Sequence, residues 1–345
     1  MLSSSIIHYF EPLWESWKTD EVIGKGSISR VYKISKREFG KEYTSALKLI
    51  SLPSKDHKIE LKRLGENNGV EELKKYIHNL VKKTIYEVRL LYELKGHSNI
   101  ISYEDHIIKK LSEENWIILL RMELVKPLRE YIIENQFTRE KTIKLGIDIC
   151  TALETCHFRN KVHGSINESN IYVSMNDSFK LGGFSLIDSE IGIDYRTLKT
   201  SDYDYIPPEL YKDNLYNDKS DIYSLGVVMY KILNNGVYLL DEFEESEKFF
   251  KKMSKAKIKP PVHSFEGLSE IILKACSQNP YDRYHTAEEF KNDLLKLKLF
   301  NNESNSFLNK IIGNKELENE VIVNEDNDDE KQKKSYFWRG VEYKR

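Results

Sequence analysis

The order of several short motifs along the chain limits its fold more than any single stretch does. The first motif is glycine-rich and joins two runs of alternating apolar and polar residues, a pattern that predicts a hairpin. The motifs are Gly24–Val31, Ala46-Leu47-Lys48, His163–Asn170, Lys180–Ser185, Pro207-Pro208-Glu209, Ser220–Gly226 and Pro280–Arg283. Each one alone could be an ordinary turn, loop or helix start, so their order carries the prediction.

Hydrophobic periodicity predicts a β-rich first part and a helical second part. The expected strands lie within 20–50 and at 116–120, 171–173 and 179–181. The expected helices are 81–94, 139–158, one that opens at 220–221, and 286–298. The charged stretch 53–80 is expected to be a loop that leads into the first helix. Thr286 is expected to cap the last helix, with Glu289 three residues on.

Composition argues against some classes of partner. The chain has 345 residues, 40% of them hydrophobic, and a net charge of only −2. Nothing in this balance points to nucleic acid or to a membrane surface. No run approaches the length of a transmembrane helix, and residues 1–10 lack the pattern of a signal peptide. Three cysteines without a close pair favour a reducing compartment, so we expect a cytoplasmic protein.

The composition changes near residue 300. Residues 302–334 are acidic and carry no aromatic side chain after Phe307, which predicts a disordered tail over 300–345. The tail includes the aromatic segment 336–343, which is either a docking motif or a frayed end. We therefore expect an N-terminal extension at 1–19, a folded domain at 20–299, and this tail.

In their order and spacing, the motifs resemble those of the eukaryotic-like Ser/Thr protein kinases, most of all the bacterial members. Gly24–Val31 is similar to the glycine-rich loop of that family, His163–Asn170 to its catalytic loop, and Lys180–Ser185 to the stretch that carries D-F-G. The resemblance covers about residues 20–295. It implies a bilobal α+β fold, with a small β-rich N-lobe at about 20–122 and a larger, mainly α-helical C-lobe at about 126–299.

The resemblance also implies a nucleotide site. In such kinases a strand lysine grips the phosphates and a helix glutamate orients that lysine. Lys48 and Glu87 stand at these positions, although a solvent-facing lysine and a surface pair of Glu87 with Lys83 are simpler interpretations of each alone. The residues implied to contact nucleotide are Gly24, Gly26, Ser29, Val31, Ala46, Lys48, Glu87, Met122, Glu123, Leu124, Asn170 and Tyr172.

Other matching positions imply structural roles. Leu91, Tyr103, His163 and Phe184 fall where the family stacks a spine of side chains, and Asp221 falls where that spine is anchored. In a second role, Glu209 and Arg283 are expected to form a buried ion pair in the C-lobe.

The departures from the family are concentrated in the chemistry. Where the family has the aspartate that accepts the proton of the substrate hydroxyl, this chain has Ser165, which has no usable basicity at neutral pH. Asn167 replaces the family's lysine that contacts the transferred phosphate, and Gly164 replaces the arginine before the aspartate. Gly183 replaces the aspartate that holds Mg²⁺ in the family. Asn170 is then the one metal ligand left, and a weak one, so the resemblance implies a pseudokinase.

Three functions are compatible with these residues. In the first, the chain binds nucleotide weakly, without Mg²⁺, and acts by binding another protein, either an active kinase or an effector. In the second, it is a residual kinase that uses a substitute acid; the candidates are Glu168, Asp177, Asp188 and Asp202. In the third, it is a structural module that binds no nucleotide.

One further exchange stands near the catalytic loop. Asp202 lies where the family has a threonine whose hydroxyl contacts the catalytic aspartate, and that aspartate is here Ser165. The carboxylate and the hydroxyl have thus changed places. The hypothesis is that Asp202 accepts a hydrogen bond from Ser165 and locks the two segments together; the alternative is that Asp202 points into solvent.

Overall fold

The computed structural model describes most of the expected folded domain. The described residues are 7, 10–26, 29–53, 69–112, 115–184, 200–213, 215–237, 258–263 and 265–299, with few of the side chains over 69–80. The expected tail at 300–345 lies outside them, as does Asp188. The chain divides into two units. Unit 1 is Met1–Leu128 with Asn170–Leu186, and unit 2 is Arg129–Ser169 with Ile187–Arg345.

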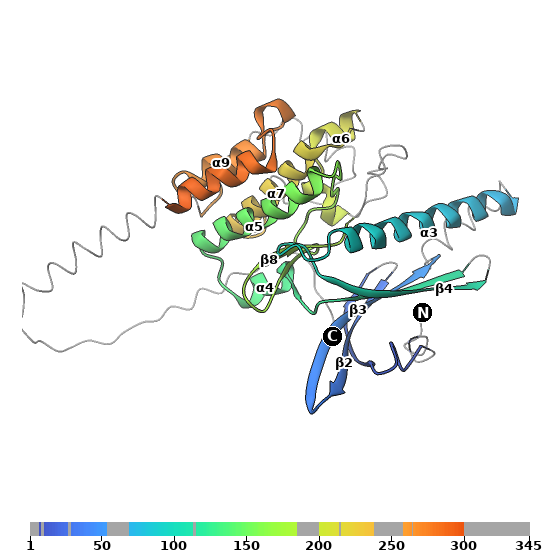
Figure 1. Ribbon diagram of the computed structural model, residues 1–345. Coiled ribbons are helices and arrows are strands. Elements are labelled where there is room, and N and C mark those ends of the chain that lie inside the picture. The colour runs from blue at the N-terminus through green and yellow to red at the C-terminus, as the bar shows by residue number, and fades with distance from the viewer. Residues whose placement is uncertain are drawn as a thin grey trace, which may run out of the picture. The chain divides into compact units, whose positions relative to one another are not determined.

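The described part of unit 1 contains two antiparallel sheets and one long helix (Figure 1). Its elements are β1 (Lys18–Lys25), β2 (Ser29–Glu38), β3 (Lys41–Leu52), α3 (Gly69–Glu93), β4 (Tyr103–Ser112), β5 (Asn115–Met122), β6 (Lys126–Pro127), β7 (Ile171–Val173) and β8 (Phe179–Leu181). The larger sheet has the order β1-β2-β3-β5-β4, and the smaller has the order β6-β7-β8. The alternating apolar runs form strands as expected, because alternation lets each strand bury one face.

The pairing register assigns the residues of the larger sheet to two faces. Lys48 pairs with Val31 on β2 and with Leu120 on β5, so these three side chains share a face. Leu47 pairs with Tyr32 and with Arg121, which share the opposite face. The sheet therefore separates the positions implied to contact nucleotide from a second, largely apolar surface.

This second surface is covered by the chain that precedes β1. Ile7 and Leu13 are buried in one hydrophobic cluster with side chains from β2, β3 and β5, and Phe10 and Trp14 pack against it. The other buried members of the cluster are Trp17, Tyr32, Ile34, Leu47, Leu49, Ile117 and Leu119. The stretch at 1–19, expected to be an extension, thus contributes to the core of unit 1 through residues 7–17.

An arginine fastens this N-terminal segment to the sheet. The guanidinium of Arg121 lies 4.8 Å from the ring centre of Trp14 and 4.9 Å from that of Trp17. Its Nε is 3.0 Å from a carboxylate oxygen of Glu104, which also accepts a hydrogen bond from Ser45. An ion pair, the stacking on two tryptophans and apolar burial therefore all attach the N-terminal segment to the sheet near Arg121.

Helix α3 begins at Gly69, well before the expected start at Val81, so the expected loop at 53–80 is wrong for its last part. Four of the five residues at 71–75 are Glu or Lys, which are good helix formers, so a charged stretch is compatible with helix here. Further along, Val81, Val88, Leu91 and Leu94 are buried. Figure 1 shows α3 and the N-terminal segment on opposite sides of the sheet.

Unit 2 is mainly helical, as expected. Its elements are α4 (Leu128–Glu134), which starts on the last residue of unit 1, then α5 (Arg139–His157), η2 (Thr200–Tyr205), α6 (Pro208–Asp213), α7 (Asp218–Leu233), α9 (Leu268–Ala275) and η3 (Pro280–Asp282), and a last helix at 287–299. The Thr286 hydroxyl accepts a bond from the N–H of Glu289, as the capping pattern predicts. Helix α7 is buried along nearly its whole length, so the rest of the unit surrounds it.

The predicted fold class is confirmed: a β-rich N-lobe contains a five-stranded antiparallel sheet, and the C-lobe is helical. The hairpin β7–β8 falls within the range expected for the C-lobe but clusters with unit 1. Among the described residues, no helix combines the length and the apolar character needed to cross a membrane.

Candidate functional site

The glycine-rich motif forms the turn between β1 and β2. The N–H of Gly26 donates to the carbonyl of Ser29 over 2.8 Å, which closes the turn around residues that lie outside the described range. Gly24 pairs with Val31, whose Cβ would lie 3.3 Å from a Cβ at position 24. A side chain at Gly24 would therefore crowd Val31, which explains the glycine on packing grounds.

Lys48 stands in the middle of β3, partly buried, and shares a face with Ala46 and Val31 as the sequence implies. Glu87 lies on α3, and its pairing with Lys48 stays a prediction.

The segment Met122–Leu124 begins on the last residue of β5, where a hinge was expected. The carboxylate oxygens of Glu123, the middle residue, lie 2.7 and 3.0 Å from Lys180 Nζ. Glu123 Oε1 also accepts a hydrogen bond from the N–H of Ser102 at 2.6 Å. The backbone N–H of Glu123 donates to Ser102 as well. The Glu123 side chain therefore ties this segment to β8 and to the start of β4. Sequence reasoning missed Lys180, which is recognisable only once β8 is placed beside β7.

Tyr172 lies in β7 next to a second glycine. A Cβ at Gly182 would lie 2.5 Å from Ile101 Cδ1 and 3.2 Å from Tyr172 Cε2. The tyrosine ring thus occupies space that a side chain at Gly182 would need. Burial raises the pKa of the Tyr172 hydroxyl above its ordinary value. The contact of Tyr172 with nucleotide, which the sequence implies, stays a prediction.

The residues at the implied metal position do not fit a divalent cation. Gly183 contributes no side chain and has a φ of +67°. A Cβ built there would lie 2.1 Å from Asn170 Oδ1 and 2.5 Å from Asn170 Cγ. Over the described residues, no cluster of three or more His, Cys, Asp or Glu side chains could hold a metal ion. Proteins usually bind Mg²⁺ through one or two carboxylates, with water and substrate phosphates completing the coordination, and residues 170 and 183 supply one amide oxygen and no carboxylate.

The loop at 163–169 belongs to unit 2 and is held by Asp221. Asp221 Oδ2 accepts the N–H of His163 at 2.8 Å, and Oδ1 accepts that of Gly164 at 2.9 Å. Gly164 has a φ of +78°, a conformation that favours glycine. The Asn167 side chain caps the loop by accepting the N–H of Ser169 at 2.9 Å. The loop is therefore ordered by polar contacts that use no catalytic carboxylate.

The implied spine residues are buried in both units. Leu91, Tyr103 and Phe184 are buried in unit 1, and His163 is fully buried in unit 2. Their stacking into one spine stays a prediction.

A buried network that sequence reasoning missed joins the same loop to the segment before Pro207. The Tyr205 hydroxyl donates to Glu168 Oε2, and Lys231 on α7 binds Asp204 at 3.0 Å. The Lys231 ammonium also lies 4.7 Å from the ring centre of Tyr205. The Asp202 side chain lies outside the described side chains, so its bond to Ser165 stays a hypothesis. The bond between Tyr205 and Glu168 is a separate contact between the same two segments.

Removing the Tyr205 hydroxyl should loosen this link. Glu168 is only 7% exposed, and its other oxygen, Oε1, is buried and has no hydrogen-bond partner among the described residues. Tyr205→Phe is therefore expected to lower the free energy of unfolding by about 1.5–3 kcal/mol. Chemical denaturation measures this, and Tyr281→Phe, at an exposed ring, is the control. Equal stability of the two variants would show that the bond contributes nothing.

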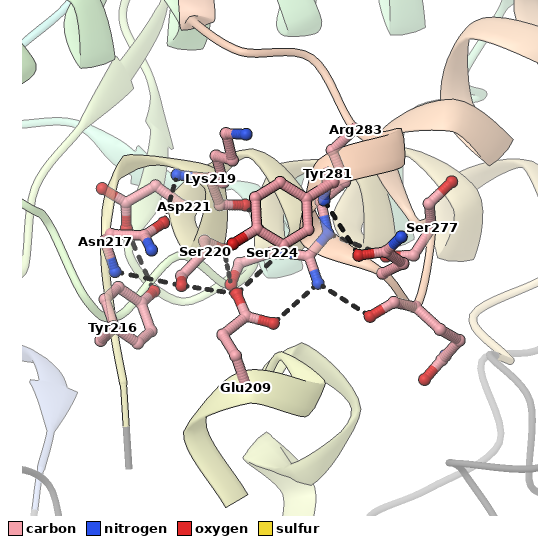
Figure 2. A network of polar contacts seen from close by, with 12 residues as sticks. Glu209, Tyr216, Asn217, Lys219, Ser220, Asp221, Ser224, Ser277, Tyr281 and Arg283 are labelled. Atoms are coloured by element: carbon pink, nitrogen blue, oxygen red, sulfur yellow. Dashed lines mark hydrogen bonds and ion pairs between the residues drawn. The ribbon is translucent and has the colours of Figure 1, made fainter. Parts of the chain in front are cut away.

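Glu209 and Arg283 form the predicted buried ion pair (Figure 2). Arg283 Nη1 and Nη2 lie 2.7 and 2.8 Å from the two carboxylate oxygens of Glu209. The guanidinium also donates to the carbonyls of Ser277 and Lys219, and the Ser220 hydroxyl donates to Glu209. Every strong donor and acceptor of the pair is therefore engaged, which is the condition under which a buried pair is tolerated.

The charge on Asp221 is balanced by a histidine. His157 Nε2 lies 2.9 Å from Asp221 Oδ2. Burial by itself would lower the pKa of His157, but the hydrogen bond to Asp221 and the charges of Asp221 and Asp218 raise it above its ordinary value. Burial would likewise raise the pKa of Asp221, but the bond and charge of His157 bring it below its usual range. Folding therefore favours the ionised pair.

This coupling predicts a pH dependence. Because the folded state raises the pKa of His157, its stabilisation is fully present below the ordinary value of 6.5 and is lost as the pH rises through the raised pKa. His157→Gln removes the charge but keeps a donor. The stability deficit of this variant should be largest near pH 5–6 and shrink toward pH 9, as measured by denaturation across pH. A deficit that grows with pH would contradict the assignment.

Comparison with known proteins agrees with this geometry. Residues 17–295 match the model of the protein kinase domain family. Aurora kinase of Yarrowia lipolytica is 23% identical over 280 residues, which cover 80% of this chain and 67% of that protein. The serine/threonine-protein kinase PknB of Mycobacterium tuberculosis is 28% identical over 172 residues, 48% of this chain and 27% of that protein. PrkC of Bacillus subtilis is 29% identical over 207 residues, 57% of this chain and 31% of that protein.

Proposed function

The chain belongs to the protein kinase domain family, and from this premise we propose that it is a pseudokinase that acts by binding another protein. It would regulate or scaffold phospho-signalling, with an active kinase or its effector as the partner, rather than transfer phosphate itself. The observation that carries the proposal is the state of the metal position, where Gly183 has no ligand atom and the space for a side chain holds Asn170.

Phosphoryl transfer depends on positioning and on the electrostatic effect of a metal ion, with little covalent chemistry for the protein to do. Ser165 cannot serve as a base, and Gly183 cannot bind a metal. Of the substitute acids, Glu168 is buried and its carboxylate is bound to Tyr205, which disfavours it as a proton acceptor. Asp177 lies in an exposed turn with a φ of +55° after β7. Glu168 is therefore disfavoured as the substitute acid of a residual kinase.

We propose weak binding of ATP that does not depend on Mg²⁺. Lys48, the turn between β1 and β2, and the aromatic ring of Tyr172 would provide the contacts. A thermal-shift titration with ATP, with and without Mg²⁺, distinguishes this from a module that binds no nucleotide. A tenfold tightening on adding Mg²⁺, about 1.4 kcal/mol, would contradict it.

The decisive test is transfer of labelled phosphate from ATP. The purified chain is expected to incorporate no label into itself or into generic substrates, with either Mg²⁺ or Mn²⁺. Lys48→Ala is the matched control, since it removes the phosphate contact. Labelling that Lys48→Ala abolishes would overturn the proposal, because it would show a working phosphate site. Labelling that persists in the variant would come from a contaminating kinase, and repurification must then remove it.

A further inference from the structure

We propose that Asn170 is a structural plug: its side chain fills the space next to Gly183 that a metal-binding side chain would need, and it no longer serves as a ligand. Asn170 Oδ1 and Cγ lie 2.1 and 2.5 Å from the position of a Cβ at residue 183, and Asn170 Cβ lies 3.2 Å from it. Distances below 3.0 Å do not occur for real Cβ atoms, so one of the two residues must move if position 183 carries a side chain.

The backbone around the two residues holds them together. The N–H of Gly182 donates to the carbonyl of Asn170 over 2.9 Å, so residues 170 and 182–183 are joined by the main chain. Leu181 is fixed in turn, because its N–H donates to Asn99 and its carbonyl accepts from Ile101. A side chain at position 183 therefore cannot be accommodated by a shift of β8, and the cost falls on Asn170.

The inference changes the meaning of the missing aspartate. Loss of a ligand alone would leave an empty place that one substitution could refill. In this chain the place is occupied, so that restoring the aspartate requires the displacement of Asn170. The inference rests on the proposed loss of metal chemistry, but the two fail separately: phosphate transfer tests the function, whereas melting of variants tests the plug.

The test is a double-mutant cycle on residues 170 and 183, read by thermal unfolding. A positive φ penalises alanine at position 183 in any background, and this penalty cancels in the cycle. Gly40→Ala provides a matched control, because Gly40 has a φ of +74° and a Cβ built there would have no atom of the described residues within 4 Å. We expect Gly40→Ala to lower the melting temperature by about 2–4 °C. Gly183→Ala should lower the melting temperature of the natural protein by at least about twice as much as Gly40→Ala does. In the Asn170→Ala background, the further decrease caused by Gly183→Ala should be no larger than that of the control.

Two further variants keep the proposal testable if a larger side chain at 183 prevents folding. Asn170→Ala alone should lower the melting temperature, whereas Asn176→Ala, at an exposed position, should not. Gly183→Asp should melt below the natural protein, and Mg²⁺ should add nothing to its shift with ATP. The plug is overturned if Asn170→Ala melts like the natural protein, if the cycle shows no coupling, or if Mg²⁺ with ATP stabilises Gly183→Asp.

Discussion

Arg283→Ala is expected to lower the free energy of unfolding by about 3–5 kcal/mol. The Arg283 side chain is completely buried and that of Glu209 is 7% exposed, so the substitution would leave a carboxylate in the interior without its counter-charge. The Tyr223 ring, 4.8 Å from the guanidinium, would lose a stacking partner as well. A loss of this size is a large part of the stability of an ordinary domain.

Unfolding the whole chain with denaturant, with circular dichroism as the signal, measures this loss. Arg37→Ala is the matched control, because Arg37 is 85% exposed and lies 3.9 Å from Glu42. An exposed pair of this kind contributes about 0–1 kcal/mol. Replacing Glu209 and Arg283 together with apolar residues of similar size should cost less than Arg283→Ala alone, since no charge is then stranded. An unchanged unfolding curve for Arg283→Ala would rule out the pair.

Leu13→Ala is expected to destabilise unit 1 by about 2–5 kcal/mol. Leu13 is fully buried in the cluster between the N-terminal segment and the sheet, and its backbone pairs with that of Trp17. The substitution would leave a cavity among Ile7, Trp17 and the strand residues. Deleting residues 1–16 should be worse, because it would expose the apolar face of β2, β3 and β5 to water.

Dye binding to exposed apolar surface, together with thermal unfolding, measures both N-terminal variants. Phe39→Ala is the control, since Phe39 is 98% exposed at the turn between β2 and β3. Unchanged stability after the deletion would mean that the segment is dispensable, and that the family match from residue 17 marks the true start of the folded unit.

The sequence predicts the elements whose cause is local. Alternating apolar residues predict β2 and β3, the apolar run at 116–120 predicts β5, and the helical stripe predicts the buried part of α3. The pair of Glu209 and Arg283 is predictable because both lie in motifs of recognisable spacing. Contacts between segments without a motif are not predictable in this way. The stacking of Arg121 on Trp14 and Trp17, and the bond of Tyr205 to Glu168, depend on register and on side-chain direction, which no pattern in one chain specifies.

The candidate site shows the same division. The substitutions at Ser165 and Gly183 are visible in the sequence, and so is their chemical consequence. The position of Asn170 beside Gly183 is not visible, because it depends on a backbone φ and a side-chain rotamer. Likewise, the sequence places Glu123 at a hinge but does not reveal that its carboxylate binds Lys180. The substitutions could therefore be recognised from the sequence alone, whereas the two side-chain contacts required the structure.

The tryptophans that hold Arg121 give the molecule a built-in optical reporter. Of the four tryptophans in the chain, Trp14, Trp17 and Trp116 all lie in unit 1, and Trp338 lies outside the described residues. Intrinsic fluorescence would thus follow mainly the opening of unit 1, while the ellipticity of the helices would weight unit 2. Melting curves recorded by both signals on one sample would show whether the two units unfold in a single cooperative step. A fluorescence change that precedes the loss of ellipticity would show that the sheet unfolds first.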